Sequence, residues 1–335
     1  MQPFKYSRAS DVAVTSQLLT ANPKAKILAG GTNILDLMKE DVERPEELVD
    51  ITNINLAEIK KLSDGANGGG VSIGATAKNT DTANHPLIRD NFPLLTQAIL
   101  SGASPQIRNM ATNGGNPNQR TRCPYFYEVS MPCNKREPGT GCGALEGVNR
   151  MHAIFGWSEK CVAVHPSDMG VALAALDAIV TVQGTNGERN ILFTDYHRLP
   201  GNTPEKDNNL NAGEVIKSIE IPSNNFQSHS YYLKVRDRSS YAFALVSVAA
   251  ALEVSGNEIK QARIGMGGVA HKPWRALEAE KYLIGKPASE SSFKEAATIA
   301  MKGAKPLAHN KFKIELGKKA IVRALILAMN GGTAS

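Results

Sequence analysis

The feature that most constrains this chain is the position of its cysteines. All four of them, Cys123, Cys133, Cys142 and Cys161, lie within one short segment of a chain of 335 residues. Thiolates brought together in this way can hold an iron–sulfur cluster or a zinc ion, or the thiols can close two disulfides. The clustering therefore predicts a chemical role for this segment.

The residues alone favour the iron–sulfur cluster but leave the other possibilities open. No two cysteines have the C-x-x-C spacing that most structural zinc sites use. Two disulfides would suit a small secreted domain, whereas this chain is long enough to build its own hydrophobic core. The residues between the cysteines are rich in Gly, Pro and Asn, which predicts a loop wrapped around a bound group. Zinc, disulfides and free thiols remain the alternatives.

Length, charge and hydropathy exclude several classes of protein. The length predicts two or three domains. The net charge of +6 comes from scattered Lys and Arg without a basic stripe interleaved with aromatic residues, so nucleic-acid binding is not expected. The most apolar run, 241–254, is too short to span a bilayer, so direct membrane insertion is not expected. The N-terminus has no apolar signal region and no twin arginine, which predicts a cytoplasmic protein, or a periplasmic one if a signal-bearing partner exports it.

Two glycine-centred turns precede the cysteines. The first, 29–33, follows a predicted strand over Ala25–Leu28, which itself follows a predicted helix over 11–19. The second lies in the segment 104–116, after a predicted strand over 71–75 and a predicted helix over 92–100. Backbone N–H groups in such turns can approach an anion closely, so the pair suggests a ligand with a pyrophosphate and many hydroxyls. Two purely structural turns are the alternative.

The chain after the last cysteine completes one domain and forms another. Pro166 and Ser167 predict the start of a helix that has Asp168 in its first turn and continues over 170–178. A boundary is expected at 222–230, where Ser, Asn and Gln dominate, and beyond it we expect a unit of three strands and three helices. The predicted strands lie at 178–183, 214–221, 231–235, 243–254 and 263–269, and the predicted helices at 274–283, 292–302 and Phe312–Met329.

Five motifs taken together resemble the FAD-binding subunit of the xanthine dehydrogenase family of molybdenum hydroxylases. In chain order they are LAGGTNILDLMK, IRNMATNGGN, HPSDM, KVRDRSSYAFALVSVAAAL and GMGGVAHKPWRA. With its cysteine segment the chain is most similar to the flavin subunit of bacterial three-subunit aldehyde oxidoreductases of the periplasmic type, which carries an additional [4Fe–4S] cluster. The resemblance implies an α+β fold. A two-subdomain FAD-binding domain of the vanillyl-alcohol-oxidase (PCMH) type would be followed by a small α/β domain of the CO-dehydrogenase flavoprotein type.

The resemblance also implies boundaries and site residues. The FAD-binding domain would span 1–225, with subdomains 1–55 and 56–225 and a cluster loop at 122–162, and the C-terminal domain would span 226–335. The first turn would bind the FAD pyrophosphate, the second would form the opposite wall, and the four cysteines would ligate the cluster. His165 and Asp168 would contact the ribityl and phosphate region, and Lys234 would place a positive charge near the isoalloxazine, beside Ile216. The full set of implied FAD contacts is Lys26, Ile27, Leu28, Ala29, Gly30, Gly31, Thr32, Asn33, Ile34, Thr112, Gly115, Asn116, Thr121, His165, Asp168, Ile216 and Lys234.

By the same resemblance the chain would be an electron-transfer subunit of a heterotrimer, with no catalytic residue of its own. A molybdopterin-containing large subunit would oxidise the aldehyde, and a [2Fe–2S] small subunit would pass the electrons on singly. FAD can accept electrons singly and deliver one or two, so it would couple that chain to an external electron acceptor. A stand-alone flavin oxidoreductase with a zinc-braced cysteine loop and a scaffold without flavin are the alternatives.

Overall fold

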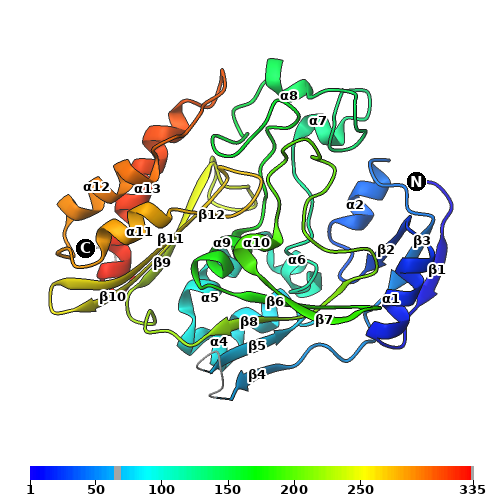
Figure 1. The fold of residues 1–335 in the computed structure, drawn as a ribbon, viewed down its shortest axis with the longest axis horizontal. Coiled ribbons are helices and arrows are strands. Elements are labelled where there is room, and N and C mark those ends of the chain that lie inside the picture. Colours follow the sequence, from blue (N-terminus) through cyan, green and yellow to red (C-terminus); the bar gives the residue numbers. More distant parts are fainter. Residues whose placement is uncertain (64–68, 333–335) are drawn as a thin grey trace.

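The described part of the chain, residues 1–63 and 69–332 of a computed structural model, forms three β-sheets. Figure 1 shows them spread across the molecule, from the N-terminal sheet on the right to the C-terminal sheet on the left. The expected domain ranges 56–225 and 226–335 each include residues outside the described part. Within residues 1–63 and 69–332, no helix is both long enough and apolar enough to cross a membrane.

The N-terminal sheet is parallel and has the strand order β1-β3-β2. Its strands are β1 (Lys5–Arg8), β2 (Ala25–Leu28) and β3 (Glu47–Asp50), and helices α1 (Val12–Ala21) and α2 (Ile34–Lys39) lie between them in the chain. Parallel neighbours need such crossover connections. Strand β2 is confirmed as predicted. The predicted first helix is also confirmed, with Asp11 as its cap, because the Asp11 carboxylate accepts a hydrogen bond from the Val14 N–H.

The central sheet is antiparallel and has the strand order β4-β5-β8-β6-β7. Three of its strands, β5, β6 and β8, lie within one residue of their predicted bounds. Strand β7 was not predicted, because its side chains are polar and mostly exposed and so show no apolar alternation. The strands are β4 (Ile59–Leu62), β5 (Gly70–Gly74), β6 (Ile179–Gly184), β7 (Gly187–Leu192) and β8 (Val215–Pro222).

Short helices connect β5 to the cysteine segment. The predicted helix at 92–100 is α5 (Pro93–Ser101), shifted by one residue. The segment 104–116 is predicted as a turn, but its first half is helix α6 (Pro105–Met110), capped by the Ser104 hydroxyl. The remaining short helices of this domain are α3 (Asn79–Asn84), α4 (Pro86–Asn91), α7 (Pro124–Tyr127), α8 (Gly143–Glu146) and α10 (Phe193–Tyr196).

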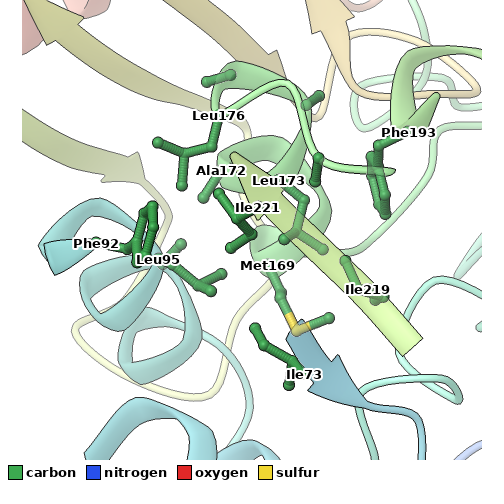
Figure 2. Close-up of a cluster of buried hydrophobic side chains, with 14 of the residues drawn as sticks. Ile73, Phe92, Leu95, Met169, Ala172, Leu173, Leu176, Phe193, Ile219 and Ile221 are labelled. Atoms are coloured by element: carbon green, nitrogen blue, oxygen red, sulfur yellow. The ribbon is translucent and has the colours of Figure 1, made fainter. Parts of the chain in front are cut away.

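Helix α9 (Asp168–Ala175) is buried along its whole length. It begins as the sequence predicted, with the Ser167 hydroxyl accepting a hydrogen bond from the Gly170 N–H at 2.8 Å. Figure 2 shows Met169 and Leu173 pointing at Ile73 and Ile219 of the central sheet, with Phe92 beside them. A helix that is apolar all round has to be covered on every side, and the central sheet covers only part of α9.

The C-terminal sheet covers another side of α9. It is antiparallel, with the order β12-β11-β10-β9, and its strands are β9 (Ser230–Val235), β10 (Val246–Ser255), β11 (Glu258–Gly267) and β12 (Trp274–Arg275). Alternate residues of β10 point to opposite faces. Ala249 and Ala251 belong to the same apolar cluster as α9, whereas Val248 and Leu252 face the C-terminal helices.

Three helices cover the outer face of the C-terminal sheet: α11 (Leu277–Leu283), α12 (Glu290–Ala300) and α13 (Phe312–Met329). Helix α13 has the predicted bounds. The helix predicted at 274–283 was wrong at its start, because Trp274 and Arg275 pair with β11 as a fourth strand. Strand β10 begins three residues later than predicted, since the chain before Val246 forms an irregular segment.

We expect Gly265→Ala to destabilise the protein by about 1–3 kcal/mol, the usual cost of overpacking a core. A Cβ at Gly265 would lie 2.8 Å from the carbonyl oxygen of Val171 in α9, and backbone cannot move aside as a side chain can. The free energy of unfolding from chemical denaturation measures the effect. Gln261→Ala, at an exposed position of the same strand, is the control and should change it by less than about 0.5 kcal/mol. Equal stabilities would contradict this account of the contact between α9 and β11.

Candidate functional site

A cleft of about 1610 Å³ is lined by residues from several separate segments between Leu19 and Phe243. One wall is the first glycine turn together with the start of α2, and the opposite wall is the second glycine turn at 111–116. The start of α9 and the loop 205–216 contribute further residues, and the segment 234–243 of the C-terminal domain closes the rim. A cleft of this size is larger than most small-molecule sites and can hold an extended dinucleotide.

The two glycine turns approach each other more closely than any side chain would allow. A Cβ on Gly30 would lie 2.0 Å from the carbonyl oxygen of Met110, and Gly31 has a positive φ of 72°. Within the described residues, the backbone N–H groups of Gly30 and Thr32 have no hydrogen-bond partner. The buried Asn33 Nδ2 also lacks one there. These donors face a shared cleft and therefore suit an anionic, oxygen-rich ligand such as a pyrophosphate.

The structure brings most of the implied FAD contacts together. All of them line the cleft except Leu28, Thr121 and His165. Leu28 ends β2, and its carbonyl accepts a hydrogen bond from the Ile51 N–H. Thr121 accepts one from the Cys123 N–H at 3.3 Å. The His165 ring lies against the His197 ring, with centroids 4.1 Å apart, and burial holds the pKa of His165 well below its usual value. These three residues are therefore placed behind the cleft wall.

Lys234 lines the cleft, but its charge is already paired. Its Nζ donates to Asp168 Oδ2 at 2.7 Å and to the Ser101 carbonyl at 3.0 Å. The other carboxylate oxygen of Asp168 accepts from the Tyr232 hydroxyl at 2.7 Å. Both partners of the ion pair are almost completely buried. The pair joins β9 of the C-terminal domain to the first turn of α9, at the floor of the cleft.

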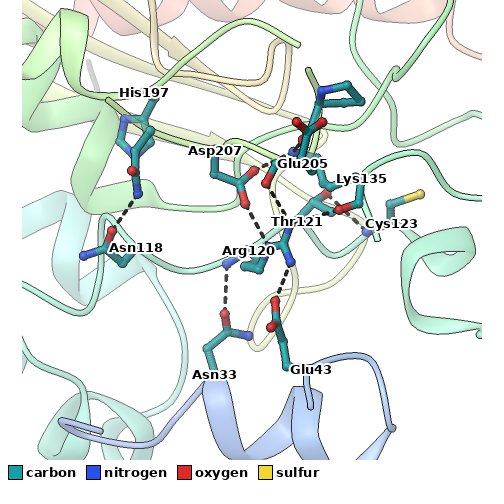
Figure 3. A network of polar contacts seen from close by, with 12 residues as sticks. Asn33, Glu43, Asn118, Arg120, Thr121, Cys123, Lys135, His197, Glu205 and Asp207 are labelled. Carbon is teal, nitrogen blue, oxygen red and sulfur yellow. Dashed lines mark hydrogen bonds and ion pairs between the residues drawn. The ribbon is translucent and has the colours of Figure 1, made fainter. Parts of the chain in front are cut away.

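A second charge network, partly buried, joins the cleft to the cysteine segment, as Figure 3 shows. Arg120 donates to Asp207 at 2.8 Å and also to Glu43, and its backbone N–H donates to Asn33 Oδ1 at 2.8 Å. Lys135, which is 3% exposed, donates to the other oxygen of Asp207 and to the Pro204 carbonyl at 2.7 Å. The Asp207 carboxylate therefore connects the loop after α10 to Lys135 of the cysteine segment and, through Arg120, to the first turn.

The pKa of Asp207 shows the strength of this network. Burial alone would raise it, but the charges of Lys135 and Arg120 outweigh burial and hold the pKa of Asp207 well below its usual value. The ionised carboxylate is thus the stable form at neutral pH. Sequence reasoning missed Arg120 and Asp207, although Arg120 stands directly between the second glycine turn and Cys123 and could have been suspected from that position.

Sequence reasoning also missed two exposed aromatic residues at the rim of the cleft, Tyr241 and Phe243. Arg122 lies over the Phe243 ring, 5.4 Å from its centroid, and also forms an ion pair with Asp36 of α2. Tyr241 has a positive φ of 50°, a conformation that non-glycine residues seldom adopt. The predicted strand over 243–254 includes Phe243, whose position at the rim depends on the strand starting only at Val246.

The four cysteines are free thiols. The backbones of Cys133 and Cys142 pair through an antiparallel bridge. A hydrogen bond between the Cys142 and Cys161 side chains lowers the pKa of Cys142 and raises that of Cys161. Burial raises the pKa of Cys123 to about 12, and its Sγ lies 3.1 Å from His152 Nε2. Burial also lowers the pKa of His152 to about 4, so the ring is neutral at pH 7.

The cysteine segment does not form a ready metal site as it stands. In residues 1–63 and 69–332, no group of three or more His, Cys, Asp or Glu side chains is arranged so that it could hold a metal ion. Of the predicted ligands Cys123, Cys133, Cys142 and Cys161, Cys142 contacts Cys133 and Cys161, whereas Cys123 contacts His152. In donor number and type, four unpaired thiols of one loop still fit a four-thiolate centre.

Two family models match nearly the whole chain. Residues 2–224 match the FAD-binding domain in molybdopterin dehydrogenase, and residues 231–328 match the CO dehydrogenase flavoprotein C-terminal domain.

Several known proteins resemble this chain. It is 44% identical over 326 residues to the aldehyde oxidoreductase FAD-binding subunit PaoB of Escherichia coli, covering 97% of this chain and 98% of that protein. It is 28% identical to the glyceraldehyde dehydrogenase medium chain of Sulfolobus acidocaldarius, covering 88% and 86% of the two chains. A solved structure of carbon monoxide dehydrogenase from Hydrogenophaga pseudoflava matches with a TM-score of 0.76 and 25% identity, over 98% of this chain and 99% of that one. The predicted α+β fold, with its PCMH-type and flavoprotein C-terminal domains, is confirmed.

We expect Gly30→Ala to weaken FAD binding about tenfold or more, which corresponds to ~1.4 kcal/mol. The new methyl group would meet the Met110 carbonyl at 2.0 Å and push the two glycine turns apart. Fluorescence titration of the flavin-free protein with FAD measures the affinity. Lys39→Ala, at an exposed position at the end of α2, should bind FAD as the wild type does. An unchanged affinity in Gly30→Ala would show that the turns do not hold the ligand.

We expect Asp207→Asn to lower the free energy of unfolding by about 3 kcal/mol at pH 7, because it leaves Lys135 and Arg120 with less compensation. This value is the lower end of the range for buried pairs, since 30% of the Asp207 side chain is exposed. The difference in free energy of unfolding between the wild type and Asp207→Asn should be fully present above about pH 4. It should shrink as the pH falls below that value, because the pKa of Asp207 is lower in the folded than in the unfolded chain.

Urea denaturation between pH 3 and pH 7 measures both effects. Glu188→Gln removes a partner of Lys217 from an exposed ion pair and should cost less than about 1 kcal/mol. A stability difference for Asp207→Asn that does not depend on pH would argue against ionised Asp207 as its source.

Proposed function

We propose, from the premise that this chain belongs to the FAD-binding subunits of the molybdenum hydroxylase family, that it carries electrons in an aldehyde-oxidising complex. The relative with 44% identity is a FAD-binding subunit of an aldehyde oxidoreductase, and the alignment covers almost all of both chains. The observation that carries the proposal is the cleft, in which the residues of two glycine turns and of the C-terminal domain face one ligand site.

In this proposal the cleft binds FAD, which supplies one- and two-electron chemistry when bound. The backbone donors at Gly30 and Thr32 and the Asn33 amide would hold the pyrophosphate. Residues 112–116 would form the opposite wall, and Asp168, Ile216 and Lys234 would approach the flavin end. Lys234 would act through its ion pair with Asp168 rather than as an isolated cation, because the pair is buried and hydrogen-bonded.

The second part of the proposal concerns the cysteine segment, where Cys123, Cys133, Cys142 and Cys161 would ligate a [4Fe–4S] cluster. Four free thiols in one loop supply the ligand set that such a cluster requires. The contacts of Cys142 with Cys133 and Cys161 support the grouping. Because no three of these side chains form a metal site as they stand, the loop would have to close further around the cluster.

The third part of the proposal concerns the partners. A molybdopterin-containing large subunit would oxidise the aldehyde, and a [2Fe–2S] small subunit would deliver the electrons to this chain, which would pass them to an external acceptor. Two relatives of this chain are the medium chains of a glyceraldehyde dehydrogenase and of a carbon monoxide dehydrogenase, which supports a heterotrimer. A partner with an export signal would place the complex in the periplasm, and otherwise it would be cytoplasmic.

The alternative is a stand-alone flavin oxidoreductase whose cysteine loop is braced by zinc. The two proposals differ in metal content and in activity. The alternative expects zinc without sulfide and aldehyde-independent turnover by this chain alone.

We expect the complex, purified without oxygen, to contain one FAD for each copy of this chain and, beyond the iron and sulfide of its [2Fe–2S] subunit, about four further iron and four further acid-labile sulfide, as a [4Fe–4S] cluster requires. Absorbance spectra together with iron, zinc and sulfide assays measure this. Cys142→Ser should lose most of the iron and sulfide of this chain but keep its flavin, because no cysteine lines the cleft. Flavin with stoichiometric zinc and without sulfide in this chain would favour the alternative.

A further inference from the structure

The C-terminal domain is hydrogen-bonded to the cysteine segment at residues 149–155. The backbone N–H groups of Ile154 and Phe155 both donate to the Val269 carbonyl, at 2.9 and 3.0 Å. In return the Lys305 N–H donates to the Ile154 carbonyl at 2.7 Å. The fully buried Asn310 side chain donates to the carbonyls of His152 and Ala153, at 3.1 and 3.2 Å. This segment is therefore positioned by a different domain from the one that contains the cysteines.

Lys313 is the centre of this contact. It is completely buried in the first turn of α13, and its Nζ donates to three carbonyls, those of Met151 and His152 at 3.0 Å and that of Gly268 at 2.7 Å. Burial lowers the pKa of Lys313 to about 7, whereas three acceptors favour the protonated ammonium. A lysine in the first turn of a helix also opposes the helix dipole. Both the burial of the Lys313 ammonium and its position in the first turn of α13 are thus unfavourable, and such local conflicts are expected at functional sites.

His152 transmits the contact to a cysteine. Its carbonyl accepts hydrogen bonds from Lys313 and Asn310, while its side chain lies with Nε2 3.1 Å from the sulfur of Cys123. The same residue thus has its backbone fixed by the C-terminal domain and its ring fixed against a thiol.

A second, parallel connection reaches the segment near Cys142. The His309 N–H donates to Asn149 Oδ1 at 2.9 Å, and the Asn149 amide donates to the Ala144 carbonyl at 3.2 Å. Asn149 is fully buried, so these bonds are shielded from water and hold the end of α8 in place.

We propose that Lys313 is a positioning residue for the thiol centre: through the carbonyls of Met151, His152 and Gly268 it holds the His152 imidazole against Cys123, so that the C-terminal domain sets the position and the hydrogen bonding of this sulfur. The inference rests on the proposed role of Cys123 as a cluster ligand. A metal-bound cysteine is a thiolate and can only accept, so His152 Nε2 donates to it. A hydrogen bond to a ligand sulfur stabilises the reduced, more negative cluster and raises its reduction potential.

The direct test is His152→Leu, which removes the ring donor and leaves the backbone carbonyl to Lys313. In the whole complex we expect the reduction equilibrium of this chain's cluster to shift about tenfold toward the oxidised form, ~59 mV for one electron. His152→Gln, which retains a donor, should lie nearer the wild type. An EPR-monitored redox titration measures the cluster, and the flavin potential in the same sample is the internal reference. A cluster potential in His152→Leu equal to that of the wild type would overturn the hydrogen-bond assignment.

The second test is Lys313→Met, which keeps the aliphatic stem but removes all three donors. We expect the iron and sulfide content of this chain to fall about tenfold relative to its FAD content. The FAD content itself should not change, because no residue of α13 lines the cleft. Lys319→Met, at an exposed position of the same helix, is the matched control and should keep its cluster. Full cluster content in Lys313→Met would overturn the inference. If this variant loses FAD as well, it is misfolded, and the potentials of the His152 variants decide.

Failure of the proposed function gives a different result. Wild-type chain without iron and sulfide would remove the cluster but not the positioning claim, which is then tested on the thiol itself. Alkylation of Cys123 by iodoacetamide, followed by peptide mapping, should be about tenfold faster in Lys313→Met than in the wild type and in Lys319→Met, since Cys123 is only partly exposed and opening of the segment increases access to its thiol. Equal rates in all three proteins would overturn the positioning role.

Discussion

The ion pair between Asp168 and Lys234 is the contact on which the arrangement of the cleft depends. Asp168 begins α9, and Lys234 lies in β9, so this buried interaction connects the C-terminal sheet directly to the FAD-binding domain at the cleft. Both partners have further hydrogen bonds, because the Tyr232 hydroxyl donates to the other carboxylate oxygen of Asp168 and the Ser101 carbonyl accepts a second bond from the Lys234 ammonium. A buried pair of this kind is seldom a net source of stability, but it specifies one arrangement over others, since any shift leaves a charge without its partner. In this chain the Asp168–Lys234 pair specifies the position of the rim at 234–243 relative to the glycine turns.

Helix α9 illustrates why much of the fold could be predicted from the sequence. Apolar periodicity and a Ser cap gave the start of α9, and strands β2, β5, β6, β8 and β9 were found within one residue of their bounds because each alternates or is continuously apolar. The errors follow from the absence of such a pattern. Strand β7 is polar, and Trp274 and Arg275 pair with β11 although they adjoin a helical pattern. Tertiary pairing decided these positions, and no local signal carries it.

The site was predictable to the extent that its residues are glycines and short polar side chains in turns. Gly30, Thr112 and Asn116 could be placed in one cleft because turns after strands offer backbone donors. The resemblance implies that His165 contacts the ribityl and phosphate region, whereas in the fold its ring packs against His197 and it is not among the residues that line the cleft. Arg120, Lys135 and Asp207 come from three segments that are separated in the chain, and only the folded structure brings their charges together. Long-range charge pairing leaves no spacing to recognise in a sequence.

The cysteine segment shows how one irregular loop can be ordered without regular structure of its own. Its one-turn helices α7 and α8 supply little stability, since a single turn fixes several residues for few hydrogen bonds. Order comes instead from buried cations that donate to backbone carbonyls: Lys135 of the loop itself binds the Pro204 carbonyl, and Lys313 of the C-terminal domain binds the carbonyls of Met151, His152 and Gly268. Each cation satisfies carbonyls that an irregular chain would otherwise leave unpaired. The loop is therefore tied to the segment 204–207 of the FAD-binding domain by its own lysine and to the C-terminal domain by a lysine of α13, so the position of its thiols depends on both domains.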